Sequence, residues 1–520
     1  MKTFNFKTVA SLLCIICLSA ACKKESMESV ANPEQVSQEE LASRSAAGAF
    51  APATIYALTG TNKLVGYSLQ SGLVQTSSDS ITGIQSGEKI LAIDFRPATG
   101  QLYGIGSSSR IYIINLKSGV ARAVNATSFT PAINGTVVGF DFNPTVDRIR
   151  MVTSDGQNLR LHPETGLVAF VDASLNPGSP AVNAVAYSNN TADATVTALY
   201  DIDPNTDMLY MQSPPNNGTL TAVGPLGRNI LRRGGGFDIS PDGMAYAALY
   251  DNSGPSLYTI DLVTGTATPI GAFTRPIIGL AVPTKSVAYA IAESNNDLLI
   301  LDPFTSTPVS RKTVTGLQSG ETILGIDFRP LNGQLFALGS SSRIYTLNTS
   351  SGLATVVGSG PFSPTLSGTS FGFDFNPTVD KIRIVSNTGQ NMRADPLTGG
   401  IIGVDAALNP GTPSVSAAAY INNFAGATTT ILYDIDFAND KLYKQDPPAG
   451  GTLVEVGSLG MDATASNGFD ISGMNNAGYA FLSNTSGANG LYSVNLNNGK
   501  VKPVRTFAEN VRGFALGLGF

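Results

Sequence analysis

The sequence predicts an all-β protein made of repeated four-stranded sheets, and three features of the chain lead to this fold class. Short runs rich in Ile, Val, Phe, Tyr and Leu recur about every ten residues between clusters of Gly, Pro, Asn, Asp and Ser. The octapeptide from Phe140 to Asp147 returns letter for letter at Phe373 to Asp380, an offset of 233 residues (373 − 140). Smaller units repeat within each copy, and meanders of four strands with a period of roughly 35 to 45 residues are typical of β-propeller blades.

The first element of the chain is a leader, expected at residues 1–21. Lys2 and Lys7 form a basic start, and the apolar run that ends at Ala21 is too short to span a bilayer. Small residues then precede Cys22, which resembles a bacterial lipoprotein signal, in which this cysteine becomes the lipidated first residue. An ordinary signal peptide cleaved near Ala21 is the alternative. We expect Cys22 to carry the lipid.

Residues 22–52 are expected to be a flexible tether. They are rich in Glu, Ser, Ala and Gln, and the first aromatic residue after Cys22 is Phe50, so this segment has little to bury. Cys14 and Cys17 lie in the leader, which leaves the mature domain without a thiol for a disulfide, a metal or a nucleophile. The predicted location is the bacterial cell envelope, on the outer membrane, with the lipid as the only membrane contact.

The rest of the chain is expected to be two propeller repeats of five blades each, at residues 53–285 and 286–520. A representative blade has apolar strands separated by tight turns, and its four strands begin at Ile90, Leu102, Arg110 and Ala121. Counting such units predicts ten four-stranded blades in two homologous halves.

How the blades close depends on two similar strands. The first blade begins near Ile55 without an innermost strand, and the chain ends with an innermost-type strand at Val511 to Leu518. A strand of the same kind stands at Ile277 to Val282. Propellers usually have four to eight blades, which favours two rings of five. The short connection from Val282 to Val287, at most about 17 Å long, favours one ring of ten. We favour one ten-bladed ring.

Several motifs occur in both halves and together point to a family. They are Gln85–Glu88, Asp94–Pro97, Phe140–Asp147, Gly156–Arg160 and Tyr200–Asp203. In combination they resemble the bacterial family known as domain of unknown function 4394, over residues of about 53 to 520. The resemblance implies a secreted or envelope β-propeller, and it implies no activity.

The composition excludes several kinds of chemistry. The chain has no Trp and a single histidine, His162, whose counterpart in the second copy is Asp395. His-based catalytic triads and His-based zinc or iron centres are therefore not expected, and we predict no cofactor. The net charge of −6 without a basic patch argues against nucleic acid as a partner.

Six aspartates end the predicted innermost strands: Asp94, Asp141 and Asp238, with Asp327, Asp374 and Asp470 in the second copy. They could form a carboxylate ring near a tunnel mouth that binds a cation or acts on a sugar. They could also accept hydrogen bonds from backbone N–H groups of the following turn, as Asp commonly does. We favour the second interpretation and predict no metal site.

A second polar set is the candidate ligand site. It comprises Glu88, Gln157, Asn158 and Arg160, with Glu321, Gln390, Asn391 and Arg393 in the second copy. Guanidinium and amide groups can hold a carboxylate, phosphate or sugar through paired hydrogen bonds. The same groups could instead pair between blades. A ligand site would require these loops to lie open to solvent.

Two classes of function remain. The first is an envelope-anchored lipoprotein whose propeller is a non-catalytic binding or scaffold domain for a protein, peptide or glycan. The alternative is a propeller hydrolase or lyase that acts on glycans through tunnel carboxylates. Accessible acidic residues facing each other roughly 5–10 Å apart would favour the enzyme.

Overall fold

The computed structural model describes Met1 and residues 54–231, 234–305 and 310–520. The expected leader beyond Met1, the lipidation residue Cys22 and the tether at 22–52 lie outside the described residues. Two 3-10 turns, η1 (Pro215–Asn217) and η2 (Pro448–Gly450), are the helical segments of this part. Among the described residues, no helix has the length and apolar character needed to cross a membrane.

The described residues form ten antiparallel sheets, nine with four strands and the first with an additional short strand. Each blade is given from its innermost strand outward. In the first half, blade 1 contains β21 (Ile277–Ala281), β1 (Thr54–Thr59), β2 (Lys63–Ser68), β3 (Val74–Gln75) and β4 (Asp79–Ser80), and blade 2 contains β5 (Ile90–Phe95), β6 (Leu102–Gly106), β7 (Arg110–Ile114) and β8 (Ala121–Ala123). Blade 3 contains β9 (Val138–Asn143), β10 (Arg148–Thr153), β11 (Asn158–Leu161) and β12 (Val168–Val171), and blade 4 contains β13 (Ala184–Tyr187), β14 (Leu199–Asp203), β15 (Met208–Gln212) and β16 (Leu220–Pro225). Blade 5 contains β17 (Gly236–Ile239), β18 (Ala245–Asp251), β19 (Gly254–Ile260) and β20 (Ala267–Ala272).

The second half repeats this order. Blade 6 contains β41 (Val511–Leu516), β22 (Ala288–Ala292), β23 (Leu298–Leu301) and β24 (Ser310–Lys312), and blade 7 contains β25 (Ile323–Arg329), β26 (Gln334–Gly339), β27 (Arg343–Leu347) and β28 (Ala354–Val357). Blade 8 contains β29 (Phe371–Asn376), β30 (Lys381–Ser386), β31 (Asn391–Ala394) and β32 (Ile401–Val404), and blade 9 contains β33 (Val415–Tyr420), β34 (Leu432–Asp436), β35 (Lys441–Gln445) and β36 (Leu453–Ser458). Blade 10 contains β37 (Ala463–Ile471), β38 (Gly478–Asn484), β39 (Asn489–Val494) and β40 (Val501–Phe507).

Tight turns join the strands of a blade. Between β9 and β10 the turn places Asp147 at a φ of 50°, and the matching turn between β29 and β30 places Asp380 at 54°. Asp tolerates this left-handed conformation better than most residues because its short polar side chain bonds locally. The predicted meander of four consecutive strands is confirmed for blades 2 to 5 and 7 to 10, whereas blades 1 and 6 take their innermost strand from the end of their own half.

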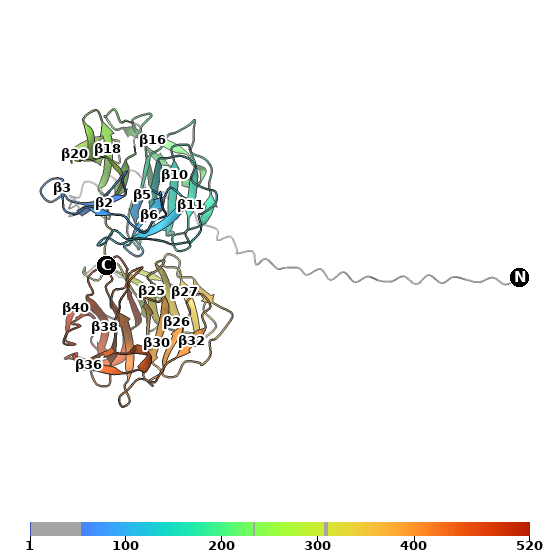
Figure 1. The fold of residues 1–520 in the computed structure, drawn as a ribbon, viewed down its shortest axis with the longest axis vertical. Helices are drawn as coiled ribbons and strands as arrows, with labels where there is room; N and C mark the ends of the chain where they lie inside the picture. Colours follow the sequence, from blue (N-terminus) through green and yellow to red (C-terminus); the bar gives the residue numbers. More distant parts are fainter. Residues whose placement is uncertain (2–53, 232–233, 306–309) are drawn as a thin grey trace. The chain divides into compact units, whose positions relative to one another are not determined.

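The prediction of one ten-bladed ring is wrong, because each half pairs with itself. In the first half β21 pairs with β1, with Ala281 opposite Tyr56. In the second half β41 pairs with β22, with Ala515 opposite Tyr289. The innermost strands of each half also contact one another in a closed cycle, β21–β5–β9–β13–β17 and β41–β25–β29–β33–β37. Strands coloured blue to green and strands coloured yellow to red therefore form two five-bladed rings (Figure 1).

The short connection misled the sequence argument for a physical reason. On the expected path, the chain would leave its ring through the outer strands of a blade. Instead, β21 ends at the face where the two halves touch, and the chain passes directly into β22. Contacts at this face include Tyr289 Oη donating to the carbonyl of Ala98 (2.9 Å) and Gly519 N–H donating to the carbonyl of Thr99 (2.8 Å).

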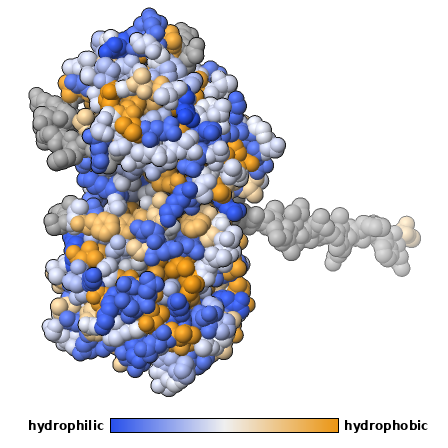
Figure 2. Space-filling view, turned by 60° about the vertical axis from the view of Figure 1, so that its left-hand side comes forward, coloured by the Kyte–Doolittle hydropathy of each residue, from blue (hydrophilic) through white to orange (hydrophobic). Residues whose placement is uncertain are grey.

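Apolar side chains fill the spaces between blades. One cluster packs Ile202 and Leu209 of blade 4 against Phe237, Ala247 and Tyr258 of blade 5, all nearly or fully buried. Large apolar residues that remain exposed are found mostly on outer strands and turns, such as Phe170, Val171 and Val404. Figure 2 shows polar and apolar residues interspersed over the face in view.

Candidate functional site

The two glutamates of the predicted ligand site are held inside their blades. Glu88 is 6% exposed and accepts hydrogen bonds from the N–H groups of Gln85 (3.2 Å) and Ser108 (3.0 Å) and from the hydroxyls of Ser108 and Tyr112. Burial raises the pKa of Glu88, but the hydrogen bonds from Ser108 and Tyr112 outweigh it and the pKa is lowered. Glu321, at 7% exposure, makes the matching contacts in the second ring.

Asn158 and Arg160 belong to a hydrogen-bonded cluster at the boundary of blades 3 and 4. Asn158 Oδ1 accepts Arg150 Nη1 (2.6 Å), and its Nδ2 donates to two backbone carbonyls. Arg150 also binds Asp172 (2.7 Å), and Arg160 binds both oxygens of Asp172 (2.8 and 2.9 Å). The second ring repeats this cluster with Asn391, Arg383, Arg393 and Asp405.

Gln157 and Gln390 fix a neighbouring loop. Gln157 accepts the N–H of Asn134 (2.9 Å) and donates to the carbonyl of Ala132 (2.9 Å). Gln390 makes the same two kinds of bond in the second ring. Asn158 and Asn391 are 2% and 1% exposed, and the amides and guanidiniums have protein partners, whereas the Arg393 side chain is 42% exposed. Ligand binding by this set stays a prediction. These groups lock neighbouring blades and loops together.

The six strand-end aspartates link neighbouring blades. Asp94 accepts the N–H of Phe142 (2.8 Å), Asp141 that of Tyr187 (3.0 Å) and Asp238 that of Val282 (2.6 Å). In each case the donor lies on or just after the innermost strand of the next blade, one residue after the position that corresponds to the aspartate. The second ring repeats the pattern with Asp327, Asp374 and Asp470. Asp94, Asp327 and Asp470 also accept the N–H of the residue that directly follows each of them (2.7, 2.7 and 2.6 Å). The expected role as an acceptor of local backbone N–H groups is therefore present, and the bond to the next blade is an additional contact that was not predicted.

The position of these aspartates has an equivalent on each of the five innermost strands, and the five positions encircle the axis of each ring. In blades 2 to 5 and 1 they hold Asp94, Asp141, Ala186, Asp238 and Ala281. One carboxylate oxygen from each of the three aspartates lies within 4.8 Å of the other two, and the same holds for Asp327, Asp374 and Asp470. We call these two groups the axial triads.

The axial triads are enclosed. All six residues are at most 1% exposed. Burial raises the pKa of each carboxyl, and neighbouring carboxylates add to the effect for Asp94, Asp141, Asp327 and Asp374. Burial raises the pKa of Asp238 and of Asp470 to about 7. A glycan therefore has no access to these carboxylates in this structure.

Asp201 and Asp434 are two further buried carboxylates whose character the sequence did not reveal. They are fully buried, and neither carboxylate oxygen has a hydrogen-bond partner within the protein. Burial raises the pKa of Asp434 to about 8 and that of Asp201 well above its usual range. The repetition of the Tyr-Asp-Ile-Asp motif in both copies was the sequence signal that could have pointed to these two residues.

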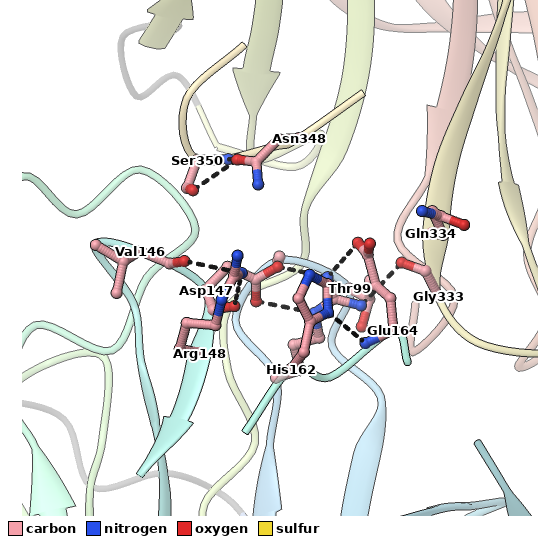
Figure 3. Close-up of polar contacts among 12 residues, drawn as sticks. Thr99, Val146, Asp147, Arg148, His162, Glu164, Gly333, Gln334, Asn348 and Ser350 are labelled. Carbon is pink, nitrogen blue, oxygen red and sulfur yellow. Dashed lines mark hydrogen bonds and ion pairs between the residues drawn. The ribbon is translucent and has the colours of Figure 1, made fainter. Parts of the chain in front are cut away.

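The junction of the two halves is organised around Arg96, which is completely buried. Its guanidinium binds Asp147, Glu164 (2.9 Å) and the carbonyl of Gly333 (2.8 Å) in the second half. Figure 3 shows Asp147, Glu164 and Gly333 together at this junction. The neighbouring His162 is a turn residue whose Nδ1 accepts the N–H of Glu164 (3.3 Å), and burial lowers its pKa to about 4.

A polar hollow of about 250 Å³ opens at the other end of the second ring, where its innermost strands begin. We call it the second-ring mouth. Every blade of the ring contributes to its lining, which consists of Glu293, Leu324, Thr369, Ser370, Phe371, Ser416, Ala465 and Arg512. Arg512 Nε lies 3.5 Å from Glu293 Oε1, and the two side chains are 26% and 34% exposed.

The first ring differs in sequence at this level. By strand pairing, Arg512 corresponds to Ile278, and by the offset of 233 residues Ser370 corresponds to Val137 and Glu293 to Gly60. The framework is thus repeated, whereas the charged pair occurs in one copy. Sequence reasoning missed the second-ring mouth because its residues are scattered over more than 200 positions.

A family model matches both copies. The domain of unknown function DUF4394 aligns with residues 63–281 and again with 298–515. The chain belongs to this family. The resemblance inferred from the repeated motifs is therefore confirmed, with two tandem matches that correspond to the two rings. A search of curated proteins finds no match.

Solved structures similar to this DUF4394 protein include extracellular and surface parts of bacterial proteins. The extracellular domain of the BT4673 one-component system from B. thetaiotaomicron is 13% identical, with a TM-score of 0.24 over 87% of this chain and 58% of that one. PorZ, a surface component of the type-IX secretion system of Porphyromonas gingivalis, is 14% identical, with a TM-score of 0.26 over 86% of this chain and 63% of that one. The chain spans less than two thirds of either.

Proposed function

We propose that this protein is a lipid-anchored component of the bacterial envelope whose twin propellers bind a ligand without catalysing a reaction. The second-ring mouth is the observation that supports binding. It combines a partly exposed guanidinium and carboxylate with hydroxyl-bearing side chains in a hollow of about 250 Å³. Ligand sites in proteins are commonly concave and carry a few polar groups that fix orientation.

The chemistry of the second-ring mouth suits a small, polar ligand end. Arg512 can bind a carboxylate through two parallel hydrogen bonds, and Glu293 can accept from an ammonium or hydroxyl group. The existing contact between the two side chains keeps both oriented while the site is free, since Arg512 Nη2 also donates to the Glu293 carbonyl (3.1 Å). The ligand class we propose is the end of a peptide or a short glycan.

The glycan-cleaving alternative has less support. It requires a pair of accessible acids, and the axial carboxylates that were its candidates are at most 1% exposed. The two buried glutamates, Glu88 and Glu321, already accept hydrogen bonds from their own blades. No observation in the described part of the chain favours this alternative over binding.

Binding is tested with a panel of free dipeptides and of mono- and disaccharides, measured by saturation-transfer NMR and calorimetry. At least one probe class should bind, and Arg512→Ala should weaken it by about tenfold or more because a charge-assisted contact is lost. Lys441→Ala is the matched control, since Lys441 forms an ion pair with Glu455 (2.7 Å) on outer strands. Binding that is equal in Arg512→Ala and wild type, or no binding by any probe, would contradict the proposal.

Anchoring is tested separately at Cys22. We expect Cys22→Ala to be released from membranes and wild type to incorporate labelled palmitate, because the acyl chains would be the membrane contact. Mutant protein that still pellets with membranes after a high-salt wash, together with unlabelled wild type, would contradict a lipid anchor.

A further inference from the structure

The axial triads bring three acidic side chains together where the described chain provides no compensating cation. The three oxygens of each triad lie within 4.8 Å of one another. None of the ion pairs formed by the described residues includes a triad member. The triad carboxylates accept backbone N–H groups, and a side-chain hydrogen bond also joins Asp94 to Asp238. Three ionised carboxylates at this spacing repel one another strongly in a buried site.

Unpartnered oxygen atoms provide a second, independent observation. Asp141 is completely buried, and its Oδ2 has no hydrogen-bond partner. Asn190, also completely buried, follows the innermost strand of blade 4 and donates to the carbonyl of Ile239, the residue after Asp238 (3.4 Å). Its Oδ1 is likewise unpartnered.

The second ring shows the same feature. Asn423, the counterpart of Asn190, is 2% exposed and its Oδ1 has no partner. The Asn423 amide lies against Asp470, where its hydrogen bond acts to lower the pKa of that carboxyl. A buried oxygen without a partner costs free energy, so its repetition at both triads points to an absent ligand that supplies positive charge.

We propose that each axial triad binds one calcium ion, giving two calcium sites per chain. Calcium prefers six to eight oxygen ligands at about 2.3–2.6 Å, so two ligands of one ion are at most about 5 Å apart. The observed limit of 4.8 Å meets this condition. The Asn423 amide, which contacts Asp470, is a candidate for a further ligand. The pKa values of the carboxyls are raised in the protein without a bound ion.

A bound ion would join blades that are not sequential neighbours around the ring. Asp141 and Asp238 lie on either side of blade 4, whose equivalent position is Ala186 and contributes no carboxylate. Coordination by both residues would therefore bridge this blade at the axis. The site would strengthen ring closure, and it is independent of ligand binding at the second-ring mouth.

The test is the calcium content of the purified protein, measured by mass spectrometry after removal of free metal, together with calorimetric titration of calcium into chelator-treated protein. Wild type should bind two ions per chain. Asp141→Asn and Asp374→Asn should each bind one and the double variant none. Asparagine keeps an oxygen to accept the N–H of Tyr187 (3.0 Å) or Tyr420 (2.9 Å), so the link between blades is preserved.

Asp201→Asn is the matched control, because it neutralises an equally buried carboxylate outside the triads and should leave two ions bound. Calcium should also raise the unfolding temperature of chelator-treated wild type, a measurement that needs no variant. Wild type that binds no calcium and shows no such shift would overturn the proposal and leave shared protons as the compensating charge. Equal calcium content in all variants would overturn it as well.

Discussion

Asp141 Oδ1 accepts the backbone N–H of Tyr187 at 3.0 Å, and this bond joins the innermost strands of two neighbouring blades. The pair recurs between Asp374 and Tyr420 at 2.9 Å. Innermost strands of neighbouring blades are not hydrogen-bonded as a sheet, so carboxylates of this kind supply the polar connection between them.

The boundary of blades 3 and 4 should depend on Arg150 more than on Arg160. Arg150 is 2% exposed and contacts Asn158, Asp172 and Asn216, whose oxygens would lose their donor in Arg150→Ala. We expect a loss of about 3–5 kcal/mol in the free energy of unfolding. Arg160→Ala should cost about 1 kcal/mol, since Arg160 is more exposed and Asp172 keeps Arg150. Urea unfolding of both variants measures the difference, and equal losses would contradict it.

The two rings should respond differently to loss of equivalent arginines. Arg96 binds Asp147, Glu164 and the Gly333 carbonyl, whereas Arg329 binds Asp380, whose side chain is 31% exposed. Arg96→Ala should destabilise by roughly 3–5 kcal/mol because it leaves buried acids unpaired. Arg329→Ala should cost on the order of 1–2 kcal/mol. Arg96→Ala should also speed proteolysis at the junction of the halves. Equal stability and equal proteolysis of the two variants would contradict a special role of Arg96 at this junction.

Close packing of innermost strands should make Gly513 sensitive to substitution. A Cβ at Gly513 would lie 2.7 Å from the backbone nitrogen of Ile326, and its φ is +67°. Gly487 has a φ of +82° and no heavy atom within 4 Å of such a Cβ. Gly487→Ala should cost about 1 kcal/mol from backbone strain, and Gly513→Ala clearly more because backbone must move. Equal midpoints in thermal unfolding would show that the innermost strands are not packed this closely.

Stability in chelator should decrease as the pH rises. Burial raises the pKa of Asp434 to about 8, against the opposing charge of Arg383, and that of Asp238 and Asp470 to about 7. An unfolded Asp has a pKa of about 3.9, so the folded state holds the proton more tightly. The stability from these groups is complete below about pH 4 and is lost as the pH rises through about 7 to 8. Unfolding temperatures between about pH 5 and pH 8 should fall, and less so in Asp434→Asn; a flat profile in both would contradict the assignment.

The local fold could be predicted because it is encoded by short-range patterns. Alternating apolar residues and turns with Gly, Asn or Asp predicted the strands of each blade. The repeated octapeptide showed which residues of the two halves correspond. Ring closure depends on which distant strand pairs with Tyr56. The strands around Ala281 and Ala515 have the same innermost character, so local pattern could not choose between them.

The candidate site was harder to predict for a related reason. Asn158 follows a glycine in a polar loop motif, which is typical of an exposed site. Its burial arises because the loop of η1, on the next blade, covers it and accepts its amide hydrogen bond at Pro215 (3.1 Å). The second-ring mouth likewise combines Glu293 with Arg512, which are close only after the ring has closed.

Engineered disulfides test ring closure most directly, since the described residues contain no cysteine. We expect Tyr56→Cys with Ala281→Cys to cross-link on oxidation, because these positions lie opposite each other on paired strands. Tyr289→Cys with Ala515→Cys should behave likewise. Tyr56→Cys with Ala515→Cys should remain reduced, because each ring closes within its own half. Efficient cross-linking of this last pair, with none in the first two, would contradict the two-ring structure and indicate one ten-bladed ring.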